Sequence, residues 1–257
     1  SDDGSIVAIG GQRKNTDELG NKTGVVRIYK NNNNSWEKVG SDILGESAYD
    51  YSGNAISISS DGSIIAIGAK KNDGNGSYSG HVRIYKNNND KWEQIGSDID
   101  GEAAYNYFGN SVTLSSDGSI VAVGAPKYNG TGDGKYLGKV RIFKNNDNNW
   151  TEIGNGITGT NNHDYAGSAI SLSSDGSKIA VGSYGNDDNG DDSGNVKVFQ
   201  NNNDNWEQIG SDIQGQQIGD NFGNSLSLSS DGNYVAVGAL NNDNNGTDSG
   251  NVRVFQN

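Results

Sequence analysis

Residues 54–69 read Asn-Ala-Ile-Ser-Ile-Ser-Ser-Asp-Gly-Ser-Ile-Ile-Ala-Ile-Gly-Ala, and this stretch decides the fold. Its first part, residues 54–59, alternates isoleucine with serine, which is the period of a strand with one buried face. Its second part, residues 63–69, is almost continuously apolar, as expected of a strand covered on both faces. The Asp61-Gly62 step between them predicts a tight turn. The stretch therefore predicts a β-hairpin with a half-buried strand and a fully buried strand.

The hairpin returns along the whole chain at a period of 56 to 58 residues. Each tryptophan precedes the next Asp-Gly step by 25 residues, so this interval does not vary. The first and third repeats are longer by two residues, which fall within residues 12–23 and 127–137. Because insertions are tolerated in solvent loops, we expect loops there and expect deletion of Asn21 with Lys22 to be nearly harmless. The repeated positions are Asp3, Asp61, Asp117, Asp175 and Asp231 for the turn, and Trp36, Trp92, Trp150 and Trp206 for the tryptophan.

Each full repeat adds two further short strands after the hairpin, such as residues 82–85 and 92–95. No stretch has a convincing helical period. Four antiparallel strands, repeated nearly five times with a buried inner strand, are typical of β-propeller blades. We therefore predict an all-β fold, a single β-propeller domain over residues 1–257, which either closes as a five-bladed ring or forms part of a larger ring. Its repeats are 1–52, 53–108, 109–166, 167–222 and 223–257, of which the first and last are incomplete.

Composition excludes several classes of partner. The chain carries a net charge of −13, which opposes the phosphates of nucleic acids and anionic lipid surfaces. Its apolar runs reach only five or six residues, whereas a membrane-spanning helix needs roughly 20. We therefore expect neither nucleic-acid binding nor membrane insertion. Cysteine is absent, so the chain has no disulfide and no thiolate site.

The third repeat suggests a family. It contains Phe108-Gly109-Asn110, then Val123-Gly124-Ala125-Pro126, and it resembles the FG-GAP repeat of integrin-α-type propellers. The copies are degenerate, since Ser52-Gly53 lacks the Phe. The resemblance implies a surface-exposed protein used for adhesion or recognition. It also implies a calcium loop between the first two strands, but that place holds only Asp117-Gly118 and its copies. One acid cannot supply the six or more oxygens that calcium takes, so we interpret Asp-Gly as a turn.

Three other loops have oxygen-bearing side chains at alternate positions, which is the spacing of calcium loops. These loops join the second and third strands of the repeats with the shorter spacing. The same residues also occur in long hairpin loops held by Asx-turns, and we favour that interpretation because no copy has Gly at its sixth position or a distal Glu. The candidate calcium ligands are Asp73, Asn75, Ser77, Asp187, Asn189, Asp191, Asp243, Asn245 and Thr247.

A ligand is expected to bind where these loops meet the connections between repeats. In an antiparallel meander both segments leave the sheet on the same face, and there they bring acids together with aromatic rings that can form pockets for a sugar or a peptide. Tyr51, Tyr107 and Tyr165 are better explained as wedges between neighbouring blades. The residues expected to contact a ligand are Tyr49, Asp50, Tyr105, His163, Asp164 and Asp220.

The sequence offers few residues that could carry out catalysis. The two histidines, His81 and His163, lie at positions whose residue type changes between repeats. A nucleophile needs a base and an orienting acid beside it, and no such cluster stands out. The carboxylates are spread over the repeats, as on a solvated acidic face. We therefore expect the chain not to be an enzyme, and to have no cofactor other than the calcium considered above.

Two classes of function fit this sequence. The first is an extracellular or surface-exposed binding or adhesion module that presents an acidic loop face to a protein or carbohydrate on a cell surface. A multivalent lectin is a special case of it. The second is a structural propeller segment of a fibre, appendage or viral or cell-surface assembly, whose partners are neighbouring subunits. The sequence does not decide between them.

Overall fold

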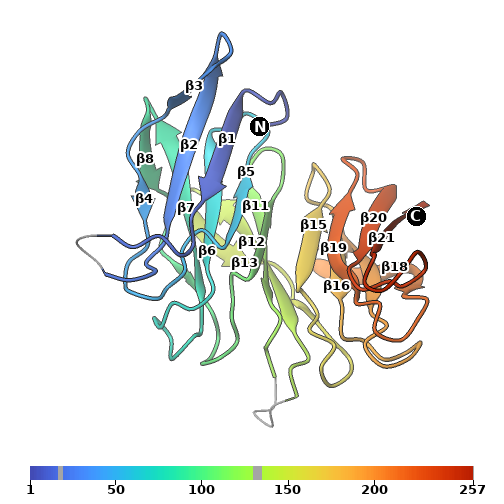
Figure 1. The fold of residues 1–257 in the computed structure, drawn as a ribbon. Helices are drawn as coiled ribbons and strands as arrows, with labels where there is room; N and C mark the ends of the chain where they lie inside the picture. Colours follow the sequence, from blue (N-terminus) through green and yellow to red (C-terminus); the bar gives the residue numbers. More distant parts are fainter. Residues whose placement is uncertain (17–19, 130–134, 257) are drawn as a thin grey trace. The chain divides into compact units, whose positions relative to one another are not determined.

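The structure is a computed structural model that describes residues 1–16, 20–129 and 135–256, and these residues form 21 strands (Figure 1). They contain no helix, and so no helix that could cross a membrane. The strands belong to five antiparallel sheets, one for each repeat. The all-β class predicted from the alternating residues is therefore confirmed.

The first two sheets come from the first two repeats. The first has the order β1-β2-β3 with β4 also beside β2, and it holds β1 (Ile6–Gly10), β2 (Val25–Asn32), β3 (Ser35–Lys38) and β4 (Ile43–Leu44). The second has the order β5-β6-β7-β8 with β9 beside β7, and it holds β5 (Ala55–Ile58), β6 (Ile64–Ala69), β7 (His81–Asn88), β8 (Lys91–Gln94) and β9 (Ile99–Asp100).

The other three sheets follow the same order of strands. The third holds β10 (Ser111–Leu114), β11 (Ile120–Ala125), β12 (Lys139–Asn146), β13 (Asn149–Glu152) and β14 (Ile157–Thr158). The fourth holds β15 (Ala169–Leu172), β16 (Lys178–Ser183), β17 (Asn195–Asn202) and β18 (Asn205–Gln214). The fifth holds β19 (Phe222–Leu228), β20 (Tyr234–Ala239) and β21 (Asn251–Gln256).

The chain separates into two compact units. The first consists of Ser1–Val121 and Phe143–Thr151, and the second of Ala122–Ile142 and Glu152–Asn257. The first unit contains the first two sheets whole, and the second contains the fourth and fifth sheets whole. The prediction of a single domain over 1–257 stays a prediction.

The Asp-Gly step forms the turn expected of it. In the second repeat Asp61 accepts a hydrogen bond from the Ser59 hydroxyl at 2.7 Å and another from the Ser63 N–H at 2.9 Å. Gly62 has a φ of 72°, in the left-handed region that a residue without Cβ adopts without strain. The same bonds recur around Asp117, Asp175 and Asp231. The turn uses the aspartate oxygens that a calcium ion would need.

The inner strands of neighbouring blades approach closely at glycines, which explains the family motif physically. A Cβ added to Gly68 would lie 2.2 Å from the carbonyl oxygen of Gly109, and one added to Gly182 would lie 2.1 Å from that of Gly223. Gly68 and Gly182 occupy the Gly-Ala position of the motif, while Gly109 and Gly223 occupy its Phe-Gly position. Any side chain at the first position would therefore push two blades apart.

The outer strands are joined by tryptophans. The indole N–H of Trp92 donates to the carbonyl of Val39 at 3.1 Å, and that of Trp150 donates to Ile95 at 3.1 Å. These two tryptophans thus fasten their blades to the preceding ones, whereas the indole N–H of Trp206 is buried without a hydrogen-bond partner among the described residues. Trp36 holds the same place in the first repeat, and its side chain is 49% exposed.

Candidate functional site

In each of the first four repeats, the loop between the second and third strands is hydrogen-bonded to the connection that follows the last strand. In the second repeat the N–H groups of Tyr105 and Phe108 donate to the carbonyls of Ser77 and Ser79, at 2.8 and 3.0 Å. We name each such pair a loop face. The loop faces consist of residues 20–24 with 45–52, 72–80 with 101–108, 135–138 with 159–166, and 186–194 with 215–222.

These bonds correct one expectation from the sequence. The segments 12–23 and 127–137 lie between strands as predicted, except that residues 17–19 and 130–134 fall outside the described residues. However, the carbonyls of Asn21 and Lys22 accept the N–H groups of Tyr49 and Tyr51, at 2.8 and 3.1 Å. Deleting this pair would remove two bonds of the first loop face, so we expect the deletion to cost stability rather than to be harmless.

Aromatic side chains stand at fixed positions on the loop faces. Tyr49, Tyr105 and His163 hold equivalent places, and their φ angles are 69°, 63° and 62°. This left-handed conformation is uncommon for bulky residues and is held here by the hydrogen bonds between loop and connection. The side chains of Tyr49 and Tyr105 are 49% and 56% exposed, and His163 is also exposed. The structure therefore places all three predicted aromatic residues at the surface.

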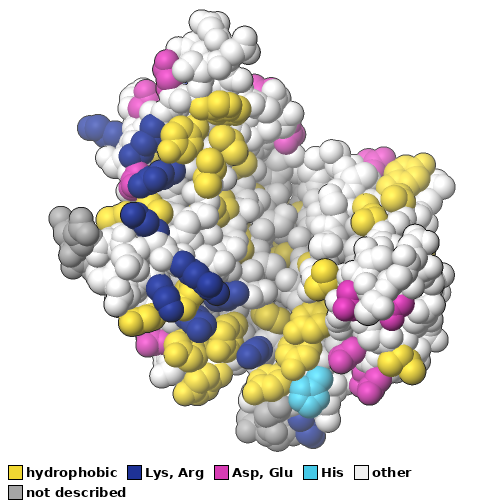
Figure 2. All heavy atoms as spheres, viewed as in Figure 1, with side chains coloured by type: hydrophobic (Ala, Val, Ile, Leu, Met, Phe, Trp, Pro, Cys, Tyr) yellow, Lys and Arg dark blue, Asp and Glu magenta, His cyan; other side chains and the backbone are white. Residues whose placement is uncertain are grey.

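Tyr105 belongs to a small cluster of rings. Its ring centroid lies 5.8 Å from that of Tyr78, which lies 5.8 Å from that of Tyr107. The ammonium group of Lys71 lies 5.0 Å from the centre of the Tyr78 ring, within the range of a cation–π interaction. Figure 2 shows Lys and Arg side chains among hydrophobic ones on one face of the N-terminal strands. One side of the Tyr105 ring packs against this cluster, and the other side is exposed to solvent.

Tyr165 has a different environment, in line with the wedge interpretation. Its ring stacks on Tyr184 of the next blade, with centroids 5.0 Å apart and planes 5° apart, and on Tyr136 at 5.8 Å. Tyr165 is half-buried, so this ring is used in packing between blades.

The acids expected beside these rings are buried in the connections rather than presented at the surface, although Asp50 also lines a pocket. Asp50, Asp164 and Asp220 are each only 2% exposed. Asp164 accepts hydrogen bonds from the backbone of Thr160 and Asn161, at 2.9 and 2.8 Å, and from the side chain of Asn186 at 3.0 Å. The other two make corresponding bonds to Asn72 and Asn242. These aspartates close the turns of the connections and tie each to the next blade.

The predicted calcium loops share one set of internal bonds. The carboxylate at the first position accepts the backbone N–H five residues later, in Asp73 from Tyr78 at 2.7 Å, in Asp187 from Asp192 at 2.8 Å and in Asp243 from Asp248 at 2.8 Å. At the third position Asn75 and Asn189 donate their amide groups to the carbonyls of Gly101 and Gly215, at 2.8 and 2.7 Å. Ser77, Asp191, Asn245 and Thr247 are exposed. Calcium binding by these loops stays a prediction.

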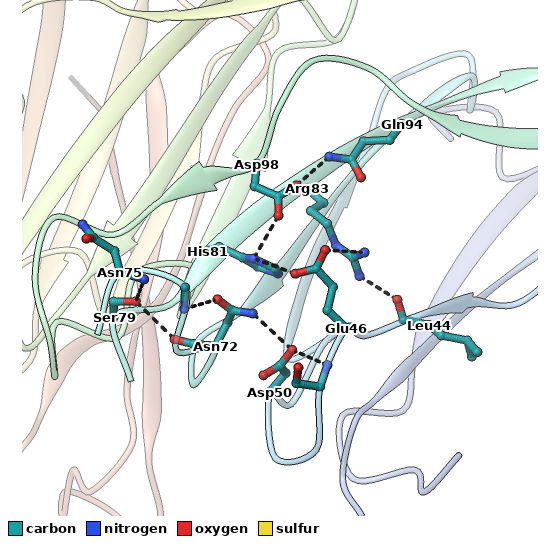
Figure 3. Close-up of polar contacts among 12 residues, drawn as sticks. Leu44, Glu46, Asp50, Asn72, Asn75, Ser79, His81, Arg83, Gln94 and Asp98 are labelled. Carbon is teal, nitrogen blue, oxygen red and sulfur yellow. Dashed lines mark hydrogen bonds and ion pairs between the residues drawn. The ribbon is translucent and has the colours of Figure 1, made fainter. Parts of the chain in front are cut away.

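A site that the sequence analysis did not single out surrounds His81, the first residue of β7 (Figure 3). Its Nδ1 lies 3.7 Å from Oε2 of Glu46, in the segment after β4, and 3.5 Å from Oδ2 of Asp98, just before β9. His81 is 1% exposed, whereas Glu46 is exposed and Asp98 is half-buried. The three groups border a pocket of about 430 Å³ that Asp50 and Asp100 also line. All of these residues lie in the first compact unit.

Burial sets the charges in this pocket. Loss of solvent, together with the nearby Arg83, lowers the pKa of His81 to about 4, so the imidazole is neutral at pH 7. Burial raises the pKa of Glu46, which Arg83 opposes and the neighbouring Asp98 reinforces. Burial also raises the pKa of Asp100. The pocket is therefore an acidic site with one neutral imidazole.

The sequence did contain a signal for this site. The positions equivalent to His81 are occupied by Val25, Lys139, Asn195 and Asn251. Such variation argues against a function shared by all repeats, but a residue that departs from its repeat is also how a repeated fold acquires a unique site. The three partners are separated by 35 and 17 residues in sequence, so only the fold brings them together.

Comparison with known proteins identifies a repeat family and a fold. Residues 215–255 match the FG-GAP repeat, so the chain contains an FG-GAP repeat. No curated protein sequence matches the chain. Among solved structures, the periplasmic gluconolactonase of Pseudomonas aeruginosa is similar with a TM-score of 0.59 and 13% identity, over 98% of this chain and 67% of that chain. This likeness and the five antiparallel sheets confirm the predicted β-propeller fold.

The same likeness corrects the expectation that the chain is not an enzyme. That expectation rests on even repeats and on the lack of a catalytic cluster in the sequence. The similar structure is an enzyme with a propeller fold, so this architecture does not exclude catalysis and the expectation is withdrawn.

Proposed function

From the premise of an FG-GAP repeat on a β-propeller, we propose that this chain is a recognition module that works outside the cytoplasm. In this proposal it binds carbohydrate on a cell surface through the tyrosines of its loop faces. The location is supported by the FG-GAP repeat and by the periplasmic source of the similar gluconolactonase.

The observation that carries the proposal is the exposure of Tyr49 and Tyr105 in fixed left-handed conformations. A tyrosine offers a large amphipathic contact area and loses little conformational entropy on binding, especially when its backbone is already held. Its ring can cover the apolar face of a sugar, while its hydroxyl forms a hydrogen bond.

Exposed acids also lie on the loops of the fourth and fifth repeats, which belong to the second compact unit. Asp187, Asp191 and Asp243 are exposed, and their carboxylates can accept hydrogen bonds from sugar hydroxyl groups. These acidic loops give the second compact unit polar groups of its own for sugar recognition.

A structural role in an assembly is a second candidate, and one observation favours it. Val252 and Val254 on β21 are 70% and 66% exposed. Exposed apolar side chains give a neighbouring subunit a surface to pack against.

The test compares sugar binding by the parent chain and by tyrosine variants. We expect binding on an oligosaccharide array, and Tyr105→Ala and Tyr49→Ala should each weaken it at least about tenfold by calorimetry. Tyr234→Ala is the matched control, because Tyr234 is 47% exposed but begins β20, away from the loop faces. Sugar binding that is equal in all three variants, or absent in the parent, would refute the proposal. Concentration-dependent self-association in the ultracentrifuge would instead support the structural role.

A further inference from the structure

The donor atoms of Glu46, His81 and Asp98 have the spacing of ligands around one ion. They all lie within 4.8 Å of one another, and the imidazole Nδ1 is 3.5 and 3.7 Å from the two carboxylate oxygens. Good N–H···O hydrogen bonds are about 2.7–3.2 Å long, so these contacts are too long for direct bonding. Ligands at about 2.1 Å from a tetrahedral ion are separated by roughly 3.4 Å.

Each carboxylate has one oxygen held by the protein and the other turned toward His81 (Figure 3). The side chain of Gln94 donates to Oδ1 of Asp98 at 2.6 Å, which leaves Oδ2 for the imidazole. Arg83 lies 3.5 Å from Oε1 of Glu46, which leaves Oε2. Such outer contacts are what orient the carboxylate ligands of metal sites.

The histidine supplies an independent observation. His81 is 1% exposed, and the nitrogen that it turns toward the two carboxylates is Nδ1, which lies no closer than 3.5 Å to either of them. Five of the ten residues that line the pocket carry carboxylates, and none of the ten is a lysine or arginine. A buried imidazole aimed at this excess of negative charge is an arrangement that a cation would complete.

We propose that Glu46, His81 and Asp98 form a binding site for a divalent transition-metal ion, with Zn²⁺ as the best match. One imidazole nitrogen and two carboxylate oxygens are ligands that zinc takes in proteins, whereas calcium takes oxygen ligands only. Three protein ligands leave one position of a tetrahedral ion for water or for an oxygen atom of a bound partner. None of these three ligands is among the residues predicted to bind calcium, although Asp73 of the second-repeat loop lines the same pocket.

The donor set occurs once among the repeats. At the equivalent positions the third repeat has Lys139 with Gly156, and the fourth has Asn195 with Asp212. Only the second blade, together with the segment that precedes it, combines a histidine with two acids. We therefore expect one ion per chain rather than one per blade.

The test measures Zn²⁺ binding by the full chain, produced without a histidine tag and stripped with chelator. We expect one equivalent of Zn²⁺ by calorimetry, and His81→Asn and Asp98→Asn should each weaken binding by roughly 100-fold or more. Asparagine already occupies the position of His81 in two other repeats, so the first variant is compatible with the blade. His163→Asn removes the other, exposed histidine and should bind as the parent does.

A second measurement does not depend on variants. Zn²⁺ should shift the ring ¹⁵N resonances of His81 and leave those of His163 unchanged. The proposal is overturned if the parent binds no stoichiometric Zn²⁺, if His81→Asn and Asp98→Asn bind as well as the parent, or if the resonances of His163 shift instead. Should circular dichroism show His81→Asn to be unfolded, the comparison of Asp98→Asn with the parent and the ¹⁵N shifts decide.

Discussion

Replacing Asp164 by alanine should destabilise the propeller although no apolar contact is lost. The carboxylate accepts hydrogen bonds from two backbone N–H groups and from the Asn186 side chain, all between 2.8 and 3.0 Å, and Asn186 is fully buried. A hydrogen bond to a charged acceptor contributes about 1.5–3 kcal/mol, with water able to replace part of it at the two N–H groups near the surface. We therefore expect the free energy of unfolding to fall by roughly 3–5 kcal/mol.

A loss of that size should lower the melting temperature by about 10 °C in a domain of this length, measured by calorimetry. Asp164→Asn keeps an acceptor oxygen and resembles the second repeat, which has the buried Asn106 at this place, so it should cost only about 1 kcal/mol. Asp191→Ala, which removes an exposed carboxylate, should stay within about 0.5 kcal/mol of the parent. The reasoning fails if Asp164→Ala melts within about 2 °C of the parent.

Three further predictions follow from the fold. Gly68→Ala should cost about 3 kcal/mol in urea unfolding, because the new Cβ would lie 2.2 Å from the Gly109 carbonyl, and an unchanged midpoint would show that the blades can separate freely. The backbone N–H of Ser177 and the Ser173 hydroxyl lower the pKa of Asp175 from 3.8. A carboxyl with a lowered folded pKa stabilises the fold above its unfolded pKa and loses this contribution as the pH falls through its folded pKa, so Asp175→Asn should flatten the acid dependence of stability below about pH 4. Calcium below about 1 mM should not raise the melting temperature, because each loop has at most two carboxylates at its first, third and fifth positions, and a rise of several degrees with micromolar calcium would contradict this.

The strands and turns could be predicted because their causes are local. The alternation in residues 54–59 and the Asp-Gly steps each act within a few residues of sequence. Strand β5, predicted over 54–59, spans Ala55–Ile58. The surface positions of Tyr49 and Tyr105 followed from topology alone, since a meander brings its loops and connections to one face.

The orientation of individual polar side chains could not be predicted in the same way. Asp164 looked like a surface acid, but its partner Asn186 lies 22 residues away on the next blade, and a pattern within one repeat does not reveal that bond. The site around His81 could not be predicted for the same reason, because one of its members, Glu46, belongs to the preceding repeat. Sequence analysis of a repeat protein identifies residues that recur in every repeat, whereas a unique site consists of residues that occur in only one.

The tryptophans that join the blades provide an intrinsic fluorescence signal for the unfolding of this chain. The indoles of Trp92 and Trp150 are bound to the carbonyls of Val39 and Ile95, so their emission reports on two successive blade contacts. Trp36 occupies the same position with about half of its surface in water and serves as an internal reference. In a repeat protein each module is stabilised mainly by its neighbours, so loss of order spreads from contact to contact. With single tryptophans retained in turn, the order in which the signals change would trace the path of that spreading without any added label.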